Sequence, residues 1–278
     1  MEKIIADNKF ISDTADITLC PLINIDSTEM DTEKIILIAK AINENIKNYD
    51  GILITHGTDT MAYTAALLSV MLDNPAIPIV ITGSQKPYFS PDTDAKKNLT
   101  DAFTAVCEEK LKCVSVVFNE DIFSGSDCYK SSSVSFSAFS AYDKKLGKVK
   151  DNKVTILNKQ GIYAGKYKFS PDICSKVALI KLSPNFDENI IDMYISNGIK
   201  GFVIEGYGTG GIPERVIKKL KAAAEKNIPS MLITQCRDGG TDPYIYEVGH
   251  NMLSAGIIDG KKLGAEAALA VMMKMTAD

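Results

Sequence analysis

Short apolar runs alternate with stretches of helical length along most of this 278-residue chain. The runs are four to six residues long and rich in Ile, Val and Leu, whereas the intervening stretches repeat apolar residues every three or four positions. This alternation is typical of parallel strands joined by helices, because a parallel pair needs a crossover connection. The sequence therefore predicts an α/β fold with a mainly parallel sheet flanked by helices.

The predicted strands are the runs at residues 22–25, 51–55, 78–82, 114–118, 177–182, 201–204 and 230–234. The predicted helices lie at about 31–47, 58–72, 94–110, 188–196, 214–226, 244–255 and 264–275. In the first of these helices, Ile35, Ile38 and Ile42 recur at helical spacing, and Asp31 suits the N-cap position.

The chain is longer than the size at which a single core usually stops growing, so two domains are expected. Residues 142–175 are rich in Lys, Gly and Asn and carry only short candidate strands, which is typical of a connection. We predict a larger N-terminal domain at residues 1–150, an interdomain linker at 151–175, and a smaller α/β domain at 176–278.

Charge and composition exclude several classes of protein. The 31 basic and 35 acidic residues give a net charge of -4 without a basic block, so nucleic acid is not an expected partner. No apolar run has the roughly 18–20 residues of a membrane span, and the start lacks a signal-peptide core. We therefore expect a cytoplasmic protein with no membrane partner.

Cysteine and histidine usage points away from disulfides and zinc. The six cysteines are scattered without a Cys-x-x-Cys pair, so we expect reduced and mostly buried thiols. His56 and His250 are the two histidines, which excludes a histidine-rich metal site. We expect both to be structural, because a lone histidine at a strand end is more often a satisfied rim residue than a base.

Hydroxyl and acidic side chains follow the first three predicted strands, at residues 26–28, 55–60 and 82–85. Ligands of open α/β sheets bind beyond the carboxyl ends of the strands, so these loops should meet at one rim. Thr58 and Asp59 by themselves could simply cap the next helix, and Lys130 by itself could be a solvated surface lysine. A Lys130 amine buried beside Thr58 would instead accept the threonine proton and create a nucleophile without histidine.

The run from Tyr49 to Ala65, YDGILITHGTDTMAYTA, resembles the second signature of the bacterial-type L-asparaginases. The segment around Lys130 is similar to that of the cytoplasmic type I members. Further segments are similar to other blocks of this family, in the same order along nearly the whole chain, at residues 26–30, 82–85 with Asp94 and Asn98, 130–139, 207–213, 234–236 and 246–249.

This resemblance implies two asparaginase-like domains, the C-terminal one Rossmann-like, in a homodimer or homotetramer. It implies hydrolysis of L-asparagine, and potentially of L-glutamine, through a threonine acyl-enzyme and without a metal or organic cofactor. Thr58, Asp59 and Lys130 would be catalytic, with Asp59 also holding the substrate's α-ammonium group. The residues implied to bind substrate are Asp26, Ser27, Thr28, Gly57, Ser84 and Gln85, with Ser27 on the α-carboxylate.

The sequence departs from the family pattern at two places. It lacks the Thr-Gly-Gly-Thr strand that carries the family's first nucleophile, so we expect a sheet without one central strand and an impaired turnover. Gly211 stands where many relatives carry asparagine. Two alternatives therefore stay open: a catalytically silent protein that binds asparagine or aspartate, and an amidotransferase subunit that releases ammonia for tRNA-bound glutamate.

Overall fold

The computed structural model describes residues 2–159, 162, 165–242 and 254–277. It divides into two compact units, Met1–Pro171 and Asp172–Asp278. The helix predicted at 244–255 and the segment at 246–249 fall almost entirely on residues outside this description, and so does His250.

Unit 1 is built on a six-stranded sheet with the order β1-β3-β4-β5-β8-β9. Strands β1 (Ile52–Thr55), β3 (Ile79–Thr82) and β4 (Val114–Phe118) are parallel and match predicted runs. The sheet continues with the antiparallel strands β5 (Asp121–Ser124), β8 (Gly147–Lys150) and β9 (Lys153–Ile156). The chain reverses between β4 and β5 at Asn119 and Glu120, whose positive φ angles of 49° and 68° suit a two-residue hairpin turn.

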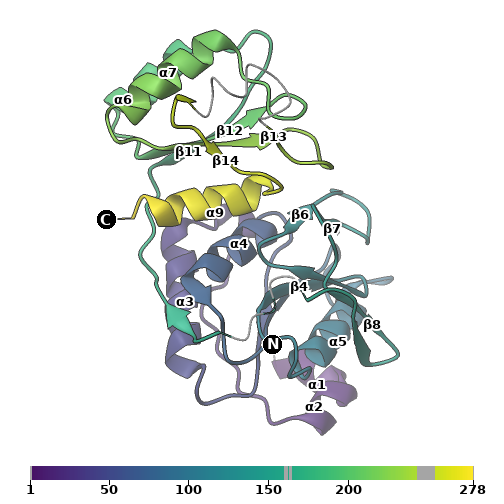
Figure 1. The fold of residues 1–278 in the computed structure, drawn as a ribbon. Helices are drawn as coiled ribbons and strands as arrows, with labels where there is room; N and C mark the ends of the chain where they lie inside the picture. The colour runs from purple at the N-terminus through teal and green to yellow at the C-terminus, as the bar shows by residue number, and fades with distance from the viewer. Residues whose placement is uncertain (1, 160–161, 163–164, 243–253, 278) are drawn as a thin grey trace. The chain divides into compact units, whose positions relative to one another are not determined.

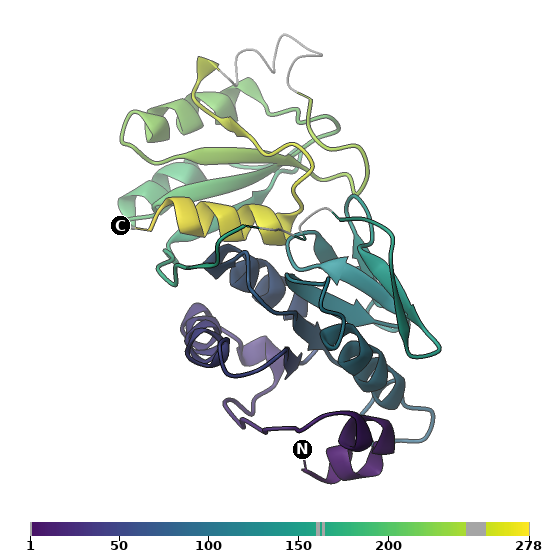
Figure 2. The ribbon, with the colours of Figure 1, turned by 60° about the horizontal axis from the view of Figure 1, so that its bottom comes forward.

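Helices cover both faces of this sheet (Figures 1 and 2). Ala102 and Ala105 of α5 (Ala95–Val106) pack with Val80 and Val117 on one face. Side chains alternate along a strand, and α4 (Met61–Met71) contacts β3 and β4 from the opposite face. The predicted helix at 31–47 is α3 (Thr32–Asn45), which contacts α4.

Two short helices that the sequence pattern does not predict lie at the start of unit 1. They are α1 (Glu2–Asp7) and α2 (Lys9–Thr14). Ile11 of α2 is 1% exposed and packs against Leu99 and Phe103 of α5. These contacts hold the N-terminal segment against α5. Two further pairs of short strands, β2 (Leu72–Asp73) with β10 (Lys168–Phe169) and β6 (Cys128–Lys130) with β7 (Phe139–Ala141), complete the unit.

The strand predicted at residues 22–25 does not form. Leu22 and Ile25 are 37% and 41% exposed, and the segment is irregular, with a bend at Ile25 and no strand partner. Its apolar pattern favours a strand, but a strand needs a neighbour with which to form hydrogen bonds. Among the described residues no strand pairs with the outer side of β1, so β1 is an edge strand whose residues Ile52–Ile54 are only half-buried.

The connection between the units is shorter than the predicted linker at 151–175. Residues 153–156 form β9, because Asp151 and Asn152, with φ of 50° and 54°, turn the chain back against β8. Further along, Lys168 and Phe169 pair with β2 and hold that stretch on unit 1. Most of the segment predicted as the interdomain linker, residues 151–175, therefore belongs to unit 1.

Unit 2 contains a parallel sheet with the order β11-β12-β13-β14. Its strands are β11 (Val177–Lys181), β12 (Gly201–Gly206), β13 (Ser230–Thr234) and β14 (Ile258–Asp259). On one face Val203 packs with Met272 of α9 (Ala265–Met275). On the other, Phe202 packs with the layer of α6 (Asn189–Ser196) and α7 (Glu214–Ala224). The predicted class is confirmed: a larger N-terminal and a smaller C-terminal α/β domain.

The six cysteines, all among the described residues, are free thiols, as predicted. The expectation that most of them are buried is wrong, because Cys20, Cys107 and Cys236 are exposed. Cys107 directly follows the last turn of α5, where the chain leaves the core. Cys113 is buried, and this burial raises the pKa of its thiol to about 12. No helix in the described part of the chain has the length and apolar character needed to cross a membrane.

The first testable prediction concerns the start of α3. The Asp31 carboxylate accepts a hydrogen bond from the Lys34 main-chain N–H at 2.9 Å, as an N-cap residue does. Asp31→Ala should lower the urea concentration at the midpoint of unfolding, because it leaves this N–H group without its acceptor. Urea unfolding followed by circular dichroism measures the change, and Asp31→Asn, which keeps an acceptor oxygen, should retain most of the stability. An equal loss in both variants would contradict a capping role.

Candidate active site

The amine of Lys130 contacts two residues of the loop that follows β1. Lys130 is the last residue of β6, and its Nζ donates to Thr58 Oγ1 at 2.8 Å and to Asp59 Oδ1 at 2.6 Å. The lysine side chain is 18% exposed, whereas the Asp59 side chain is 58% exposed. The lysine is therefore sheltered from solvent, and its charge is balanced by a carboxylate at the rim.

Gln85 determines the direction of the hydrogen bonds around Thr58. Its Nε2 donates to the main-chain oxygen of Ser135 at 3.2 Å, which orients the carboxamide so that Oε1 lies 3.2 Å from Thr58 Oγ1. A carboxamide oxygen only accepts, so the Thr58 hydroxyl donates its proton to Gln85 and accepts from Lys130. The contacts thus run in one direction, from Lys130 through Thr58 to Gln85.

Ser27 lies directly against the Thr58 loop, although the strand predicted before it does not form. It is 6% exposed, and its Oγ accepts from the Asp59 N–H at 3.3 Å. Its main-chain oxygen accepts from Thr60 Oγ1 at 2.7 Å. A Cβ atom on Gly57 would come within 2.6 Å of Ser27 Oγ, so glycine is required for this close approach. The loops after residues 25 and 55 therefore meet, as their sequences predict.

The side chains of three further residues of the predicted site form hydrogen bonds within their own loops. Asp26 Oδ1 accepts from the Thr28 N–H at 2.8 Å and from Thr28 Oγ1 at 2.7 Å, and so caps the 3-10 turn η1 (Ser27–Glu29). The hydrogen bond from the Thr28 N–H has the largest effect on the pKa of Asp26, followed by the one from the Thr28 hydroxyl. Together they hold this pKa below its usual value. Ser84 Oγ donates to the main-chain oxygen of Lys86 at 2.7 Å. In this structure these side chains shape the rim.

Asp94 and Asn98 contribute to the site in a way that the sequence pattern does not predict. Both lie in a segment that resembles a family block, and the resemblance implies no role for either of them. The Asp94 carboxylate accepts from the main-chain N–H groups of Gln85 and Lys86, and Asn98 Nδ2 donates to the main-chain oxygen of Gly83. Their spacing of four at the start of α5, directly after a strand-end loop, is the sequence signal that could have indicated such an anchor.

His56 is a satisfied structural residue at the end of β1. Its Nδ1 lies 2.6 Å from the main-chain oxygen of Gly57, which only accepts, so Nδ1 carries the proton. Its Nε2 accepts from Thr64 Oγ1 at 3.0 Å. Burial lowers the pKa of His56, and the hydrogen bond to Gly57 only partly opposes this effect. Each ring nitrogen therefore has a hydrogen-bond partner when the ring is neutral.

This burial predicts a pH dependence of stability. The pKa of His56 in the folded state lies below the unfolded value of about 6.5, so folding favours the neutral ring. The stabilisation is complete above the unfolded pKa and is lost as the pH falls from there through the folded pKa. We expect His56→Gln to lose less stability than the wild type between pH 7.5 and pH 5.5 in urea unfolding. Identical slopes for the two proteins would contradict this assignment.

Two family models match the chain: "Asparaginase, N-terminal" over residues 1–161 and "Glutaminase/Asparaginase C-terminal domain" over residues 176–278. An L-asparaginase of Thermococcus kodakarensis is 36% identical over 264 residues, which cover 94% of this chain and 80% of that protein. The fold and these matches define a two-domain α/β amidohydrolase. Within that class, the chain belongs to the asparaginase family.

Solved structures agree with this assignment. The thermostable L-asparaginase from Thermococcus kodakarensis has a TM-score of 0.86, with 92% of this chain and 79% of that chain covered. A probable cytoplasmic L-asparaginase from Campylobacter jejuni also has a TM-score of 0.86 at 27% identity, with 99% of this chain and 88% of that chain covered.

A relative of another kind is a glutamyl-tRNA(Gln) amidotransferase subunit of Methanobrevibacter smithii. It is 34% identical over 95% of this chain, but this chain spans 63% of its length.

Proposed function

We propose that this chain hydrolyses the side-chain amide of L-asparagine to L-aspartate and ammonia. One observation carries the proposal: the Lys130 amine lies within hydrogen-bonding distance of both Thr58 Oγ1 and Asp59 Oδ1. A threonine hydroxyl needs a base in contact with it to become a nucleophile, and a lysine amine is such a base once it has lost its proton.

The proposed reaction has two halves. Deprotonated Lys130 takes the proton of Thr58 Oγ1 while this oxygen bonds to the amide carbon. Lys130 then returns the proton to the amide nitrogen, the C–N bond breaks, and ammonia leaves. Water next attacks the ester carbon, its proton passes through Lys130 to Thr58 Oγ1, and aspartate is released. No metal or organic cofactor takes part in this proposal.

The neighbouring groups have distinct proposed tasks. The Asp59 carboxylate, 58% exposed and beside Lys130, is accessible to the α-ammonium group of the substrate. The Ser27 hydroxyl binds the α-carboxylate. Main-chain groups near Gly57 and Ser84 hold the amide oxygen as it becomes negatively charged. Because Lys130 donates to Thr58 in the resting arrangement, the cycle begins when Lys130 loses a proton and the Thr58 hydroxyl turns its own proton from Gln85 Oε1 to the free amine.

Ammonia release tests the proposal directly. The purified chain is incubated with L-asparagine or L-glutamine, and ammonia and the amino-acid product are measured together. We expect equal amounts of ammonia and aspartate from asparagine. Calorimetric binding of asparagine without ammonia release would instead identify the catalytically silent binding protein, and the absence of both would reject the two functions.

Similarity favours an asparaginase over an amidotransferase subunit, because the relative from Thermococcus kodakarensis that is 36% identical and the solved structures with a TM-score of 0.86 are L-asparaginases. The chain spans 80% of the Thermococcus kodakarensis L-asparaginase and 63% of the Methanobrevibacter smithii amidotransferase protein. The expected partner is therefore a small-molecule substrate. We also propose that the protein acts in the cytoplasm as a homodimer or homotetramer, and light scattering during size-exclusion chromatography measures the number of protomers.

A further inference from the structure

The Asp94 carboxylate does not cap the main chain of the helix that it precedes. Asp94 occupies the N-cap position of α5, yet its side chain makes no capping hydrogen bond. The Thr93 hydroxyl instead accepts from the Ala95 N–H at 3.1 Å, inside the first turn. Helix capping therefore does not explain an aspartate at this position.

The carboxylate faces the loop that follows β3. The Gln85 N–H lies 3.1 Å from Oδ1 and 2.9 Å from Oδ2 of Asp94. The Lys86 N–H donates to Oδ1 at 3.0 Å, and Asn98 Nδ2 donates to Oδ2 at 3.1 Å. Each of these partners is a donor. An ionised carboxylate accepts at both oxygens, whereas a carboxamide of the same shape would turn an NH2 group toward one of the donors.

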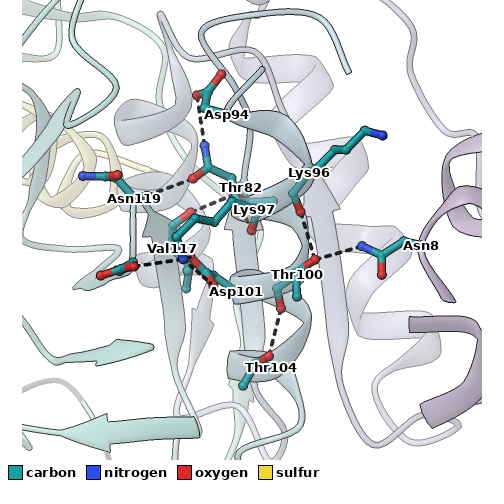
Figure 3. A network of polar contacts seen from close by, with 12 residues as sticks. Asn8, Thr82, Asp94, Lys96, Lys97, Thr100, Asp101, Thr104, Val117 and Asn119 are labelled. Carbon is teal, nitrogen blue, oxygen red and sulfur yellow. Dashed lines mark hydrogen bonds and ion pairs between the residues drawn. The ribbon is translucent and has the colours of Figure 1, made fainter. Parts of the chain in front are cut away.

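Asn98 anchors this arrangement to the core of unit 1. It is 2% exposed, its Nδ2 also donates to the Gly83 oxygen at 3.0 Å, and its Oδ1 accepts from the Asn119 N–H at 2.9 Å. Figure 3 shows Asp94 at one end of the polar network that continues along α5 to Lys97 and Asp101. The loop from Gly83 to Lys86 is thereby held to α5 and to the β4–β5 turn.

We propose that Asp94 is a positioning residue, which holds the Gln85 main chain so that the Gln85 carboxamide fixes the hydroxyl of Thr58. The carboxamide has one end on Thr58 Oγ1 and the other on the Ser135 oxygen, so its reach depends on where the loop backbone lies. Gln85, implied by the family resemblance to bind substrate, orients the proposed nucleophile instead. The kinetic consequence rests on the proposed function, but the loop anchoring does not.

The kinetic test uses Asp94→Asn, Gln85→Met and the double variant. A misplacement of about 1 Å at a reacting group can cost about 100-fold in rate, so each single variant should lower kcat by about 10- to 100-fold. KM should change little, because Ser27 and Asp59 are bound to each other and not to this loop. If Asp94 acts through Gln85, the double variant should be no slower than Gln85→Met.

Asp101→Asn is the matched control. It makes the same carboxylate-to-carboxamide change on the same helix, at a residue that is 4% exposed and pairs with Lys97 at 2.9 Å. Its kcat should equal that of the wild type. Losses that multiply in the double variant, or a wild-type kcat for Gln85→Met, would overturn the proposal. A wild-type kcat for Gln85→Met overturns the proposal even if Asp94→Asn fails to fold.

Hydrogen exchange separates this proposal from the proposed function, because it needs no turnover. In Asp94→Asn the amides of Gln85 and Lys86 should exchange faster than in the wild type, whereas in Asp101→Asn they should not. If the wild type releases no ammonia, the proposed function fails and the exchange result alone judges the anchoring. Unchanged protection of both amides in folded Asp94→Asn would overturn it.

Discussion

Replacing Lys130 with methionine should lower kcat for asparagine hydrolysis by about 10²- to 10⁴-fold, the usual effect of removing a general base. Methionine retains most of the apolar stem of lysine, so the packing around β6 changes little. The lost amine is the group that contacts Thr58 Oγ1 at 2.8 Å and Asp59 Oδ1 at 2.6 Å. Without it the Thr58 proton has no base in contact, and the Asp59 carboxylate loses its counter-ion.

Lys34→Met is the matched control for this prediction. Lys34 also pairs with an aspartate, Asp31, but on the surface of α3 and three residues along the same helix. Exposed pairs of this kind contribute at most about 1 kcal/mol, so this variant should fold and keep the wild-type kcat. Initial rates of ammonia release, with circular dichroism to check folding, measure both variants. A wild-type rate in folded Lys130→Met would rule out the amine as the base.

Gly83→Ala should lower the free energy of unfolding by about 3 kcal/mol. A Cβ atom at residue 83 would lie 2.1 Å from the main-chain oxygen of His56 and 2.7 Å from Met61 Cε. The Met61 side chain can move, but the His56 oxygen belongs to the backbone that leads from β1 to Thr58. The loops after β1 and β3 must therefore separate, which also pulls Gln85 from Thr58 and lowers activity.

Gly211→Ala makes the same change where a Cβ atom has room. The nearest atom it would meet is the Tyr207 oxygen at 3.5 Å, an ordinary contact distance. We expect its stability to stay within about 0.5 kcal/mol of the wild type. Urea unfolding measures both variants, and a Gly83→Ala protein as stable as Gly211→Ala would show that the backbone at the strand ends adapts more easily than this packing indicates.

The alternation of apolar runs and amphipathic stretches predicted β1, β3 and β4 of the first unit and the helices α4 and α5, which follow β1 and β3. These elements are local consequences of side-chain period and of burial on both faces of a sheet. The same reasoning failed at residues 22–25, where an apolar run has no strand beside it. It also missed the hairpins at 119–120 and 151–152, because nothing in an Asn-Glu or Asp-Asn pair forces a turn without its flanking strands.

The sequence by itself determined the fold class, the family, and the loops on which the chemistry-bearing residues stand, because these depend on patterns readable along the chain. Only the tertiary structure decided which of them touch. Lys130 meets Thr58 across 72 positions, and Asp94 serves a loop nine residues before it rather than its own helix. Such contacts follow from how strands and helices pack in three dimensions, and the order of residues does not encode that locally.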